Sequence, residues 1–424
     1  MEDHSFEKAT LANGLRVTTT YMPSTRSVAV SVYLGAGSRY ERPPEAGLSH
    51  LVEHLCFKGT ESRPTPQQIS QIVDSVGGTM NAATDRELTV YYGKVARPHL
   101  ELVMDILTDM LRRSLFAPEE LEKERRVILE ELAAVADSPP QLVDVLIDKV
   151  LWPDQPLGWD VGGSRETVSS MSRELVRDFV ARQYVPNNAV VSLAGNVTPE
   201  EALELVERQM GDWRRGTPWG WYPALSRQAG TQVAVTYKKT EQAQVSLAVR
   251  GLPIEHPDRH VLDLLSVILG EGMSSRLFLE LREKLGLCYD IHSYVSHFLD
   301  TGSLTIYAAM EPRKAVTALN ALMGELRRLC GTLEEDEVAR AKELSKGRLL
   351  LRMEDTRSVS GWTGAQELLL GRVRTVDEVL AGLEAVTLAD LQRVAGDLLV
   401  TEALNLAVVG PFRSDGRFVS LLKL

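Results

Sequence analysis

The chain has 424 residues, of which 44% are hydrophobic and 25% are charged, and its formal net charge is −11 at pH 7. This length suffices for roughly two to three domains, each with a core of its own. The negative charge argues against nucleic acid as a partner, and it offers no polybasic patch for a membrane surface.

The first residues, MEDHSFEKATLANGL, do not resemble a targeting segment. They lack the apolar core of a secretory signal and the arginine-rich, acid-poor composition of a transit peptide. The sequence contains no run of eighteen apolar residues, so we expect no membrane-spanning segment. Cys56, Cys288 and Cys330 are odd in number and far apart, which favours a reducing compartment. We therefore expect a cytoplasmic protein.

The first half of the chain predicts alternating strands and helices. Residues 14–35 open at the Asn13-Gly14 pair and then alternate apolar and polar side chains, a pattern typical of strands around a turn. Thr65 and Pro66 then predict the start of a helix, which the glycines at 77 and 78 end. We expect extended segments over 79–95, helices over 98–113, 117–135 and 172–184, another helix that ends near Leu151, and a buried strand over 189–195.

The tract 213–230, WRRGTPWGWYPALSRQAG, departs from this pattern. It contains three tryptophans, two prolines and three glycines and has no helical or strand periodicity. We interpret it as a linker between two domains, held in part by its aromatic side chains. The expected domains are residues 1–212 and residues 231–424.

The two halves resemble each other weakly when the chain is shifted by 215 residues. Val30-Ser31-Val32 then aligns with Val245-Ser246-Leu247, and Gly195 aligns with Gly410. Segments near the beginning and near the end of the first half align at the same shift, which indicates a duplicated α/β unit of about 200 residues.

The segment Gly47–Lys58, GLSHLVEHLCFK, carries the pattern H-x-x-E-H at His50, Glu53 and His54. On an α-helix the two histidines lie about 40° apart on one face, one turn from each other, with Glu53 beside them. Two neutral imidazoles at this spacing suit a zinc ion, and the carboxylate suits proton transfer at a metal-activated water. In the second half these positions align with Leu265, Ile268 and Leu269, so only the first half is expected to bind metal.

A catalytic zinc ion usually has three protein ligands, so a third must come from elsewhere in the chain. The helix expected over 117–135 is the best source of a carboxylate, and Glu124, Glu130 and Glu131 are its candidates.

H-x-x-E-H followed after a long gap by E-R-x-x-x-x-x-E-L resembles the inverzincin family of zinc peptidases, the group of pitrilysin, insulin-degrading enzyme and the β subunit of the mitochondrial processing peptidase. In that family the third ligand follows the second histidine after about 75 to 76 residues. The resemblance implies one zinc ion per chain and Glu131 as its third ligand, because Glu124-Arg125 matches the family's E-R. It also implies that Glu124, on the same face as Glu131, is a residue of the catalytic site.

The resemblance extends to two segments that bind substrate in the family. GGTMNAATDRELTVYY resembles the family's peptide-binding strand, with Asn81 and Ala82 at the matching positions, where an extended peptide adds to a sheet edge. GMSSRLFLELREKLGLCYDI resembles a second segment, whose arginine and tyrosine match Arg282 and Tyr289. The resemblance implies that both contact the peptide and that Tyr289 assists the developing oxyanion.

The fold that the resemblance implies is α+β. Two homologous domains, each a mixed and largely antiparallel sheet with helices packed on it, would form half of a clam-like chamber. A second chain, either identical or an inactive paralogue, would complete the chamber, and Arg282 and Tyr289 would act on the partner's site.

The implied activity is hydrolysis of peptides or unfolded segments. A zinc-bound water would attack the scissile carbonyl, and Glu53 would be the general base and not a ligand. Two alternatives are a non-catalytic subunit or assembly partner with the same fold, and a metal-binding module without turnover. The intact set of His50, Glu53, His54 and Glu131 argues against both.

Overall fold

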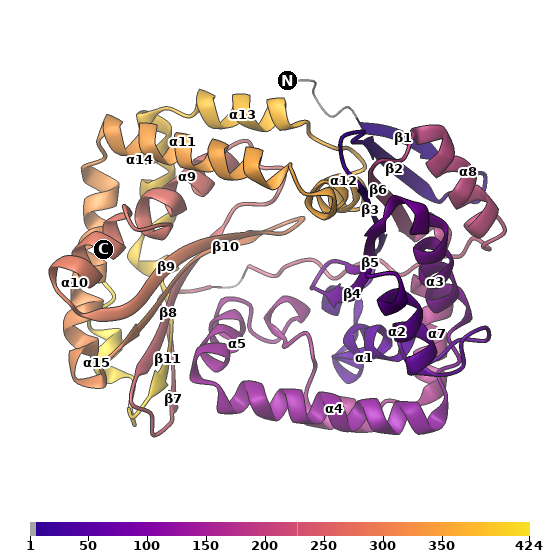
Figure 1. Ribbon diagram of the computed structural model, residues 1–424. Helices are drawn as coiled ribbons and strands as arrows, with labels where there is room; N and C mark the ends of the chain where they lie inside the picture. Colours follow the sequence, from indigo (N-terminus) through magenta and orange to yellow (C-terminus); the bar gives the residue numbers. More distant parts are fainter. Residues whose placement is uncertain (1–5, 227) are drawn as a thin grey trace. The chain divides into compact units, whose positions relative to one another are not determined.

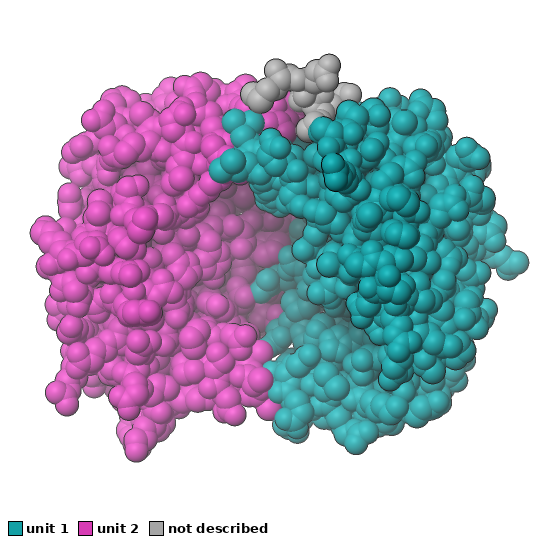
Figure 2. Space-filling view, in the orientation of Figure 1, with its two compact units in different colours: residues 1–132, 160–222, 350–374 teal, residues 133–159, 223–349, 375–424 magenta. Residues whose placement is uncertain are grey.

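The computed structural model describes residues 6–226 and 228–424. They form two compact units, each with its own sheet and helices, which confirms the expected α+β class; Figure 1 labels the elements and Figure 2 colours the units. None of the described helices has both the length and the apolar character needed to cross a membrane. Unit 1 comprises Met1–Leu132, Asp160–Tyr222 and Leu350–Arg374, and unit 2 comprises Ala133–Trp159, Pro223–Leu349 and Thr375–Leu424.

The sheet of unit 1 has six strands and is mixed. Only β2 and β6 pair in parallel, and all other neighbours are antiparallel. Both faces of its central strands are covered, which explains why β6 is buried along its whole length. The strands, in sheet order, are β1 (Phe6–Thr10), β2 (Arg16–Tyr21), β6 (Ala189–Gly195), β3 (Ser27–Leu34), β5 (Thr89–Ala96) and β4 (Thr79–Thr84).

Helices α2, α3, α4 and α7 of unit 1 lie within a few residues of the ranges that the sequence predicts. The hydroxyl of Thr65 accepts a hydrogen bond from the backbone N–H of Gln68 at 3.3 Å, with Pro66 as the first helical residue. In Figure 1, α12 lies on the opposite face of the sheet from α3 and α8. The helices are α1 (Leu48–Cys56), α2 (Pro66–Ser75), α3 (Leu100–Arg113), α4 (Pro118–Asp137), α6 (Arg165–Ser170), α7 (Arg173–Gln183), α8 (Pro199–Met210) and α12 (Thr356–Leu370).

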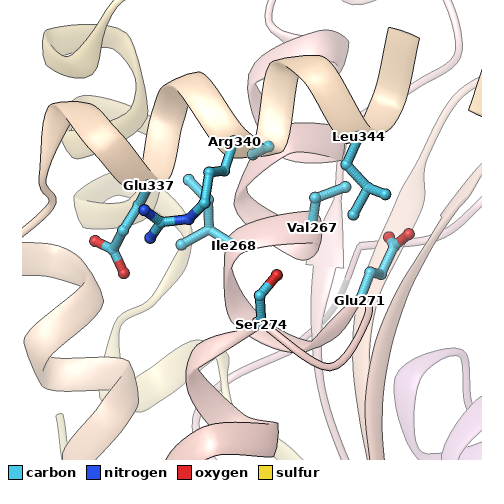
Figure 3. A pocket seen from close by; sticks show the side chains of 8 residues that line it. Val267, Ile268, Glu271, Ser274, Glu337, Arg340 and Leu344 are labelled. Carbon is cyan, nitrogen blue, oxygen red and sulfur yellow. The ribbon is translucent and has the colours of Figure 1, made fainter. Parts of the chain in front are cut away.

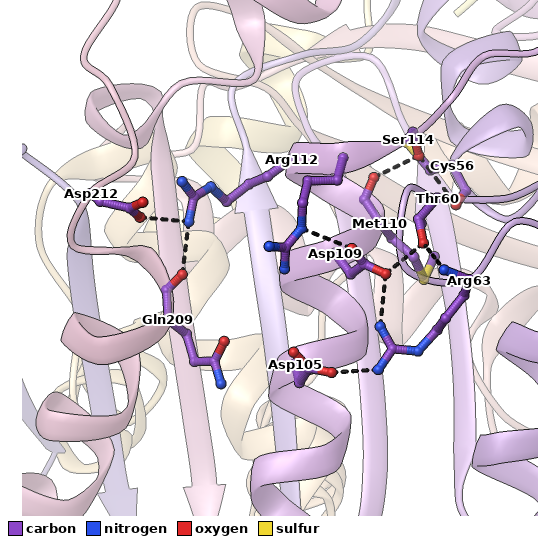
Figure 4. A network of polar contacts seen from close by, with 11 residues as sticks. Cys56, Thr60, Arg63, Asp105, Asp109, Met110, Arg112, Ser114, Gln209 and Asp212 are labelled. Atoms are coloured by element: carbon purple, nitrogen blue, oxygen red, sulfur yellow. Dashed lines mark hydrogen bonds and ion pairs between the residues drawn. The ribbon is translucent and has the colours of Figure 1, made fainter.

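A buried carboxylate on α3 holds the segment that follows α1 (Figure 4). Asp109 is fully buried, and it accepts hydrogen bonds from Thr60 Oγ1 at 2.5 Å and Arg63 Nη1 at 2.7 Å. Burial by itself would raise the pKa of Asp109, but these bonds outweigh burial and lower it. The carboxylate therefore stays charged, and it ties the end of α1 to the core of unit 1.

Unit 2 has a five-stranded sheet with helices packed on it. Its β7 and β11 pair in parallel, and the other neighbours are antiparallel. The strands, in sheet order, are β7 (Gln232–Tyr237), β11 (Asn405–Gly410), β8 (Ala243–Gly251), β10 (Gly302–Met310) and β9 (Cys288–His297). The helices are α5 (Pro139–Leu151), α9 (Arg259–Gly270), α10 (Ala315–Gly331), α11 (Glu335–Arg352), α13 (Val376–Ala385), α14 (Leu388–Leu398) and α15 (Gly416–Val419).

The two sheets have the same topology, which confirms the duplication. With the 215-residue shift, β2, β6, β3, β5 and β4 correspond in this order to β7, β11, β8, β10 and β9. The same shift superimposes α7 on α14 residue by residue and α1 on α9 to within a few residues. Only β1 has no counterpart among the described strands.

One helix from each half of the chain packs in the other unit. α5 precedes the 213–230 tract but contacts β8 and β11 of unit 2, whereas α12 follows it but contacts β2, β3 and β6 of unit 1. These two helices occupy equivalent positions in the repeat. A division of the chain at 213–230 therefore leaves each of them outside the unit in which it packs.

A small ionic cluster links β9 to α9 in unit 2. His297 Nε2 lies 3.0 Å from Asp263 Oδ1, and His297 Nδ1 lies 2.7 Å from the carbonyl oxygen of Leu252. Burial would raise the pKa of Asp263, but bonds from His260 and His297 outweigh it and lower that pKa to about 2. Burial would lower the pKa of His297, but the hydrogen bond and the charge of Asp263 outweigh burial and raise this pKa.

The stability of unit 2 should therefore depend on pH through this cluster. The raised pKa of His297 stabilises the fold below about pH 6.5. This contribution is lost as pH rises through the pKa that His297 has in the folded state. The lowered pKa of Asp263 stabilises the fold above about pH 3.9, and this contribution to stability is lost as pH falls toward about 2. We expect His297→Asn to lower the melting temperature more at pH 5.5 than at pH 8.5, measured by calorimetry. An equal loss at both pH values would contradict this linkage.

Candidate metal centre

The helix that carries H-x-x-E-H is anchored at its first turn by a buried carboxylate. Glu41 is 1% exposed and accepts hydrogen bonds from the backbone N–H groups of Gly47, at 2.8 Å, and Ser49, at 2.7 Å. Burial outweighs these bonds and raises the pKa of Glu41 to about 7. Gly47 itself has φ 96°, and a Cβ there would lie 2.6 Å from the carbonyl oxygen of Gly162. The start of α1 is thus held from two sides.

The apolar face of α1 is buried, so the side chains that can react lie on its other face. Leu48, Leu51, Val52 and Leu55 are at most 1% exposed within the core of unit 1. Cys56 is also buried, as its helical position predicts. The partly exposed residues of the helix are His50, Glu53 and His54, on the opposite face.

Two histidines and one glutamate of unit 1 converge. Glu131 Oε2 lies 4.0 Å from His50 Nε2 and 3.8 Å from His54 Nε2, and the two imidazole centroids are 4.6 Å apart. One ligand atom from each residue lies within 4.8 Å of the others. Ligands at zinc-bond lengths of about 2.0–2.2 Å in a tetrahedron would be roughly 3.5 Å apart, so small side-chain shifts would close the site. Glu130, the neighbouring candidate, does not belong to this group in the described chain.

Glu124 contacts His54 from the side away from Glu131. Its Oε2 lies 3.1 Å from His54 Nδ1, and its Oε1 pairs with Lys58 Nζ at 2.9 Å. Burial would raise the pKa of Glu124, but His54 and Lys58 outweigh it and lower it, so the carboxylate is ionised. A carboxylate only accepts hydrogen bonds, so Nδ1 carries the hydrogen and the lone pair of Nε2 points toward Glu131. Glu124 is therefore a positioning residue for His54.

The pKa values of the two histidines shift in opposite directions. Burial, together with the neighbouring His54, lowers the pKa of His50 to about 4. His50 Nδ1 is buried and has no hydrogen-bond partner among the described residues. For His54, burial would lower the pKa, but the bond to Glu124 outweighs burial and raises it. His50 is thus a neutral donor at pH 7, whereas Glu124 favours protonation of His54, so protons compete with a cation more strongly at His54 than at His50.

Glu53 lies beside the three ligands and outside their group. Its Oε2 accepts a hydrogen bond from Thr84 Oγ1 at 2.5 Å, at the end of β4. Burial raises the pKa of Glu53, and the Thr84 bond opposes this shift. A carboxylate with a raised pKa near a metal-activated water can accept a proton and return it.

The donor set fits zinc better than the other common divalent cations. Two imidazole nitrogens and one carboxylate oxygen are the ligands of open catalytic zinc sites, whereas magnesium and calcium select oxygen ligands. Partial burial of the imidazoles, with side-chain exposures of 22% and 17%, leaves one side accessible for a fourth ligand. His50, His54 and Glu131 would hold the ion.

The substrate-binding candidates of the first half lie on an outer strand. Asn81 and Ala82 are on β4, which is the last strand of its sheet. The backbone N–H of Ala82 donates to Asn81 Oδ1 at 2.9 Å, so a main-chain donor here is satisfied by a side chain. Thr84, at the end of the same strand, contacts Glu53. This outer strand therefore leads directly to the metal centre.

The remaining candidates, Arg282 and Tyr289, belong to unit 2. Arg282 lies in a segment wound more widely than an α-helix, Phe278–Lys284, where the N–H of Leu285 donates to the carbonyl oxygen of Glu280. Its guanidinium lies over the rings of Phe278, at 4.7 Å, and Tyr289, at 5.9 Å. Tyr289 is 74% exposed, so it is not a core residue of β9.

Unit 2 keeps the helices but not the ligands of the metal centre. Leu265, Ile268 and Leu269 are buried where unit 1 has His50, Glu53 and His54. Between α9 and α11, the counterparts of α1 and α4, a cavity of about 100 Å³ remains (Figure 3). The residues that line it are Val267, Ile268, Glu271, Ser274, Glu337, Arg340, Ala341 and Leu344. In the part of unit 2 that the structure describes, no cluster resembles the metal centre.

Sequence reasoning missed three residues of the site: Lys58, Thr84 and Glu41. Lys58 follows His54 by four positions, so helical spacing alone would have placed it on the same face. Thr84 lies within the segment singled out for substrate binding, but its contact with Glu53 depends on how β4 packs on α1. No sequence signal points to Glu41, because a loop carboxylate that binds backbone N–H groups has no fixed spacing.

Replacing Glu124 by glutamine should weaken metal binding without unfolding the chain. The amide loses the charge that favours the protonated Nδ1 and pairs with Lys58. Loss of such an outer partner lowers metal affinity by roughly 10- to 100-fold. Competition with a chromophoric chelator would measure this, with Glu122→Gln on the exposed side of α4 as the control. Unchanged affinity would show that Glu124 does not position His54.

Family-wide sequence models match both halves of the chain. The model described as insulinase, peptidase family M16, matches residues 16–164, and the model described as the peptidase M16 inactive domain matches residues 170–345. The chain belongs to peptidase family M16. It is of the short, two-domain type, and the model called inactive covers the ligand-free helix α9 and the first part of α11. The expected family is thereby confirmed.

Relatives of this M16 chain extend over nearly its whole length. It is 35% identical to the uncharacterized zinc protease YmxG of Bacillus subtilis (strain 168), over 96% of this chain and 98% of the relative. It is 37% identical to the uncharacterized zinc protease SCO5738 of Streptomyces coelicolor, over 96% of this chain and 90% of the relative.

Solved structures show the same fold at lower identity. A protease from Helicobacter pylori has a TM-score of 0.91 at 24% identity, and covers 96% of this chain and 100% of its own. A peptidase M16 inactive domain from Pseudomonas fluorescens has a TM-score of 0.88 at 16% identity, over 97% and 99% of the two chains. These two likenesses concern the fold alone.

Proposed function

We propose that this M16 chain is a zinc-dependent endopeptidase. The observation that carries the proposal is the convergence of His50, His54 and Glu131 in unit 1, with Glu53 beside them and outside the ligand group. A closed structural site has no use for such a carboxylate, whereas an open hydrolytic site needs a proton acceptor. The names of the relatives, which call them zinc proteases, agree with this reading.

Each residue of the site has a distinct task in peptide hydrolysis. His50, His54 and Glu131 would hold a zinc ion, which would supply Lewis acidity toward a water molecule and the scissile carbonyl. Glu53 accepts the proton of the attacking water and delivers it to the leaving amine. Thr84 holds Glu53 by its hydroxyl, and Glu124 fixes the tautomer of His54.

The substrate is proposed to be an extended peptide or an unfolded segment. The outer strand β4 offers its main chain to such a peptide, with Asn81 and Ala82 on the path to Glu53. Arg282 and Tyr289, both exposed on unit 2, are proposed to contact the peptide, and the Tyr289 hydroxyl to stabilise the oxyanion.

Zinc content and cleavage of quenched peptides test the function together. We expect about one zinc ion per chain, and cleavage that a chelator abolishes and added zinc restores. Zinc binding without cleavage of any peptide would favour the alternative, a non-catalytic subunit of the same fold. Cleavage that resists removal of all metal would refute the proposed mechanism.

We further propose that two chains pair, and that Arg282 and Tyr289 act on the partner's metal centre. The partner is either an identical chain or an inactive paralogue. Mixing a His50→Ala chain with a Tyr289→Phe chain should then restore activity, because each mixed pair contains one intact site. Mixing two His50 variants is the control. No recovery, with exchange of subunits demonstrated by a size or fluorescence label, would contradict action across the pair.

A further inference from the structure

We propose that this peptidase favours substrates with an acidic side chain about five residues from the scissile bond, and that Arg26 and Lys94 recognise it. The inference rests on the proposed function and names a substrate class for the same site. It follows from a hollow of about 410 Å³ at the beginning of β4. The residues that line the hollow are Arg26, Ser27, Gly77, Thr79, Lys94, Val95 and Ala96.

Two cations, Arg26 and Lys94, lie among the residues that line the hollow. None of its lining residues is acidic. Lys94 Nζ pairs with Asp355 Oδ2 at 2.5 Å, from the segment that precedes α12. Arg26 is exposed, and its guanidinium makes no hydrogen bond or ion pair with the described residues. Among the described residues, Arg26 therefore has no ionic partner. Lys94 has one, Asp355, and can pair with a substrate carboxylate as well.

A third cation lies on the same face of the sheet. Thr79 is paired with Lys94 and Asn81 with Tyr92, so these four side chains share one face. The guanidinium of Arg357, on α12, lies 3.7 Å from the centroid of the Tyr92 ring. Through its contact with Tyr92, which is paired with Asn81, Arg357 adds a cation beside the face that Thr79 and Lys94 share.

The distance between the hollow and the metal centre sets the substrate position. Thr84, at the end of β4, contacts Glu53, whereas Thr79, at its beginning, lines the hollow. A strand rises about 3.3 Å per residue, so these two points are roughly 16 Å apart. An extended peptide along β4 with its scissile bond beside Glu53 therefore places a side chain about five residues away in the hollow.

The test uses zinc-loaded wild-type protein and peptides of one sequence. A single aspartate, or asparagine as its neutral match, is placed in turn at each position on both sides of a fixed cleavage site. We expect kcat/KM to be about two- to fivefold higher with aspartate at one position four to six residues from the bond, the range of an exposed ion pair. The preference should shrink in about 0.5 M salt, which screens exposed charges.

Two variants should move this preference in opposite directions. Arg26→Glu should abolish or reverse it, because the free cation becomes an anion. Asp355→Asn should increase it, because Lys94 loses its partner, and asparagine can still accept the bond that Asp355 Oδ1 accepts from the Ser358 N–H at 2.9 Å. Arg177→Glu, on α7, is the matched charge change away from the hollow and should leave it unchanged.

The outcomes separate this inference from the function on which it rests. Cleavage with equal rates for aspartate and asparagine at every position would overturn the inference alone. A preference for aspartate that persists in Arg26→Glu would also overturn it, because another group would then be responsible. If zinc-loaded wild type cleaved none of the peptides, the proposed function would fail, and the inference with it.

Discussion

Replacement of Glu53 by glutamine is expected to leave zinc bound and to lower kcat by roughly 10²- to 10⁴-fold, the usual contribution of a general acid–base group. Glutamine keeps the size of the side chain and still accepts the Thr84 hydrogen bond, but it cannot take a proton from the attacking water. The ligand group of His50, His54 and Glu131 is untouched, so metal affinity should change little.

Zinc content by atomic emission and kcat on one quenched peptide, both measured on the same preparation, decide this prediction. Thr84→Val is an informative companion, because it removes only the hydroxyl that holds Glu53 and should cost less than Glu53→Gln. A Glu53→Gln protein that cleaves at the wild-type rate would show that another group carries the proton. A protein that lost its zinc would show that Glu53 is a ligand.

Replacement of Glu131 by glutamine is expected to lower zinc affinity by more than about 100-fold, beyond the 10- to 100-fold loss that removing an outer partner causes. Two histidines then remain, and two protein ligands hold zinc weakly. The removal of a carboxylate between two imidazoles also leaves the charge of the cation less compensated. Chelator competition at neutral pH measures the affinity, and peptide cleavage should fall in parallel at limiting zinc.

The adjacent glutamate provides the matched control. Glu130→Gln makes the same chemical change one residue away, on an exposed part of α4 outside the ligand group, and should leave zinc affinity within experimental error. The reverse result, with Glu130→Gln losing zinc and Glu131→Gln keeping it, would assign the third ligand to Glu130. Equal and small effects of both changes would remove the proposed metal centre altogether.

Local patterns predicted most of the secondary structure of this chain. The spacing of His50, Glu53 and His54 placed them on one helical face, because rotation per residue is a property of the backbone. Thr65 and Pro66 marked the start of α2 for the same local reason. The 215-residue repeat predicted two related sheets, and the order of the five strands that correspond agrees with it.

The packing of the sheets was beyond such patterns. α5 and α12 are amphipathic segments with short connections, and their sequences fit either sheet equally well as far as periodicity can tell. Their exchange between the units depends on which apolar surfaces meet in three dimensions. Periodicity reports that a face will be buried, but not the surface that buries it.

The sequence by itself determined that two imidazoles and a carboxylate lie together on α1, since helical geometry needs no information from elsewhere in the chain. Helical spacing left Glu124, Glu130 and Glu131 open and the family resemblance favoured Glu131, but only the tertiary structure shows which of them lies beside both imidazoles. Glu124 and Glu131 share a face of α4, yet one meets His54 Nδ1 and the other faces both Nε2 atoms. That difference depends on how α4 crosses α1, and the crossing of two helices about 60 residues apart is set by the core between them and not by either sequence alone.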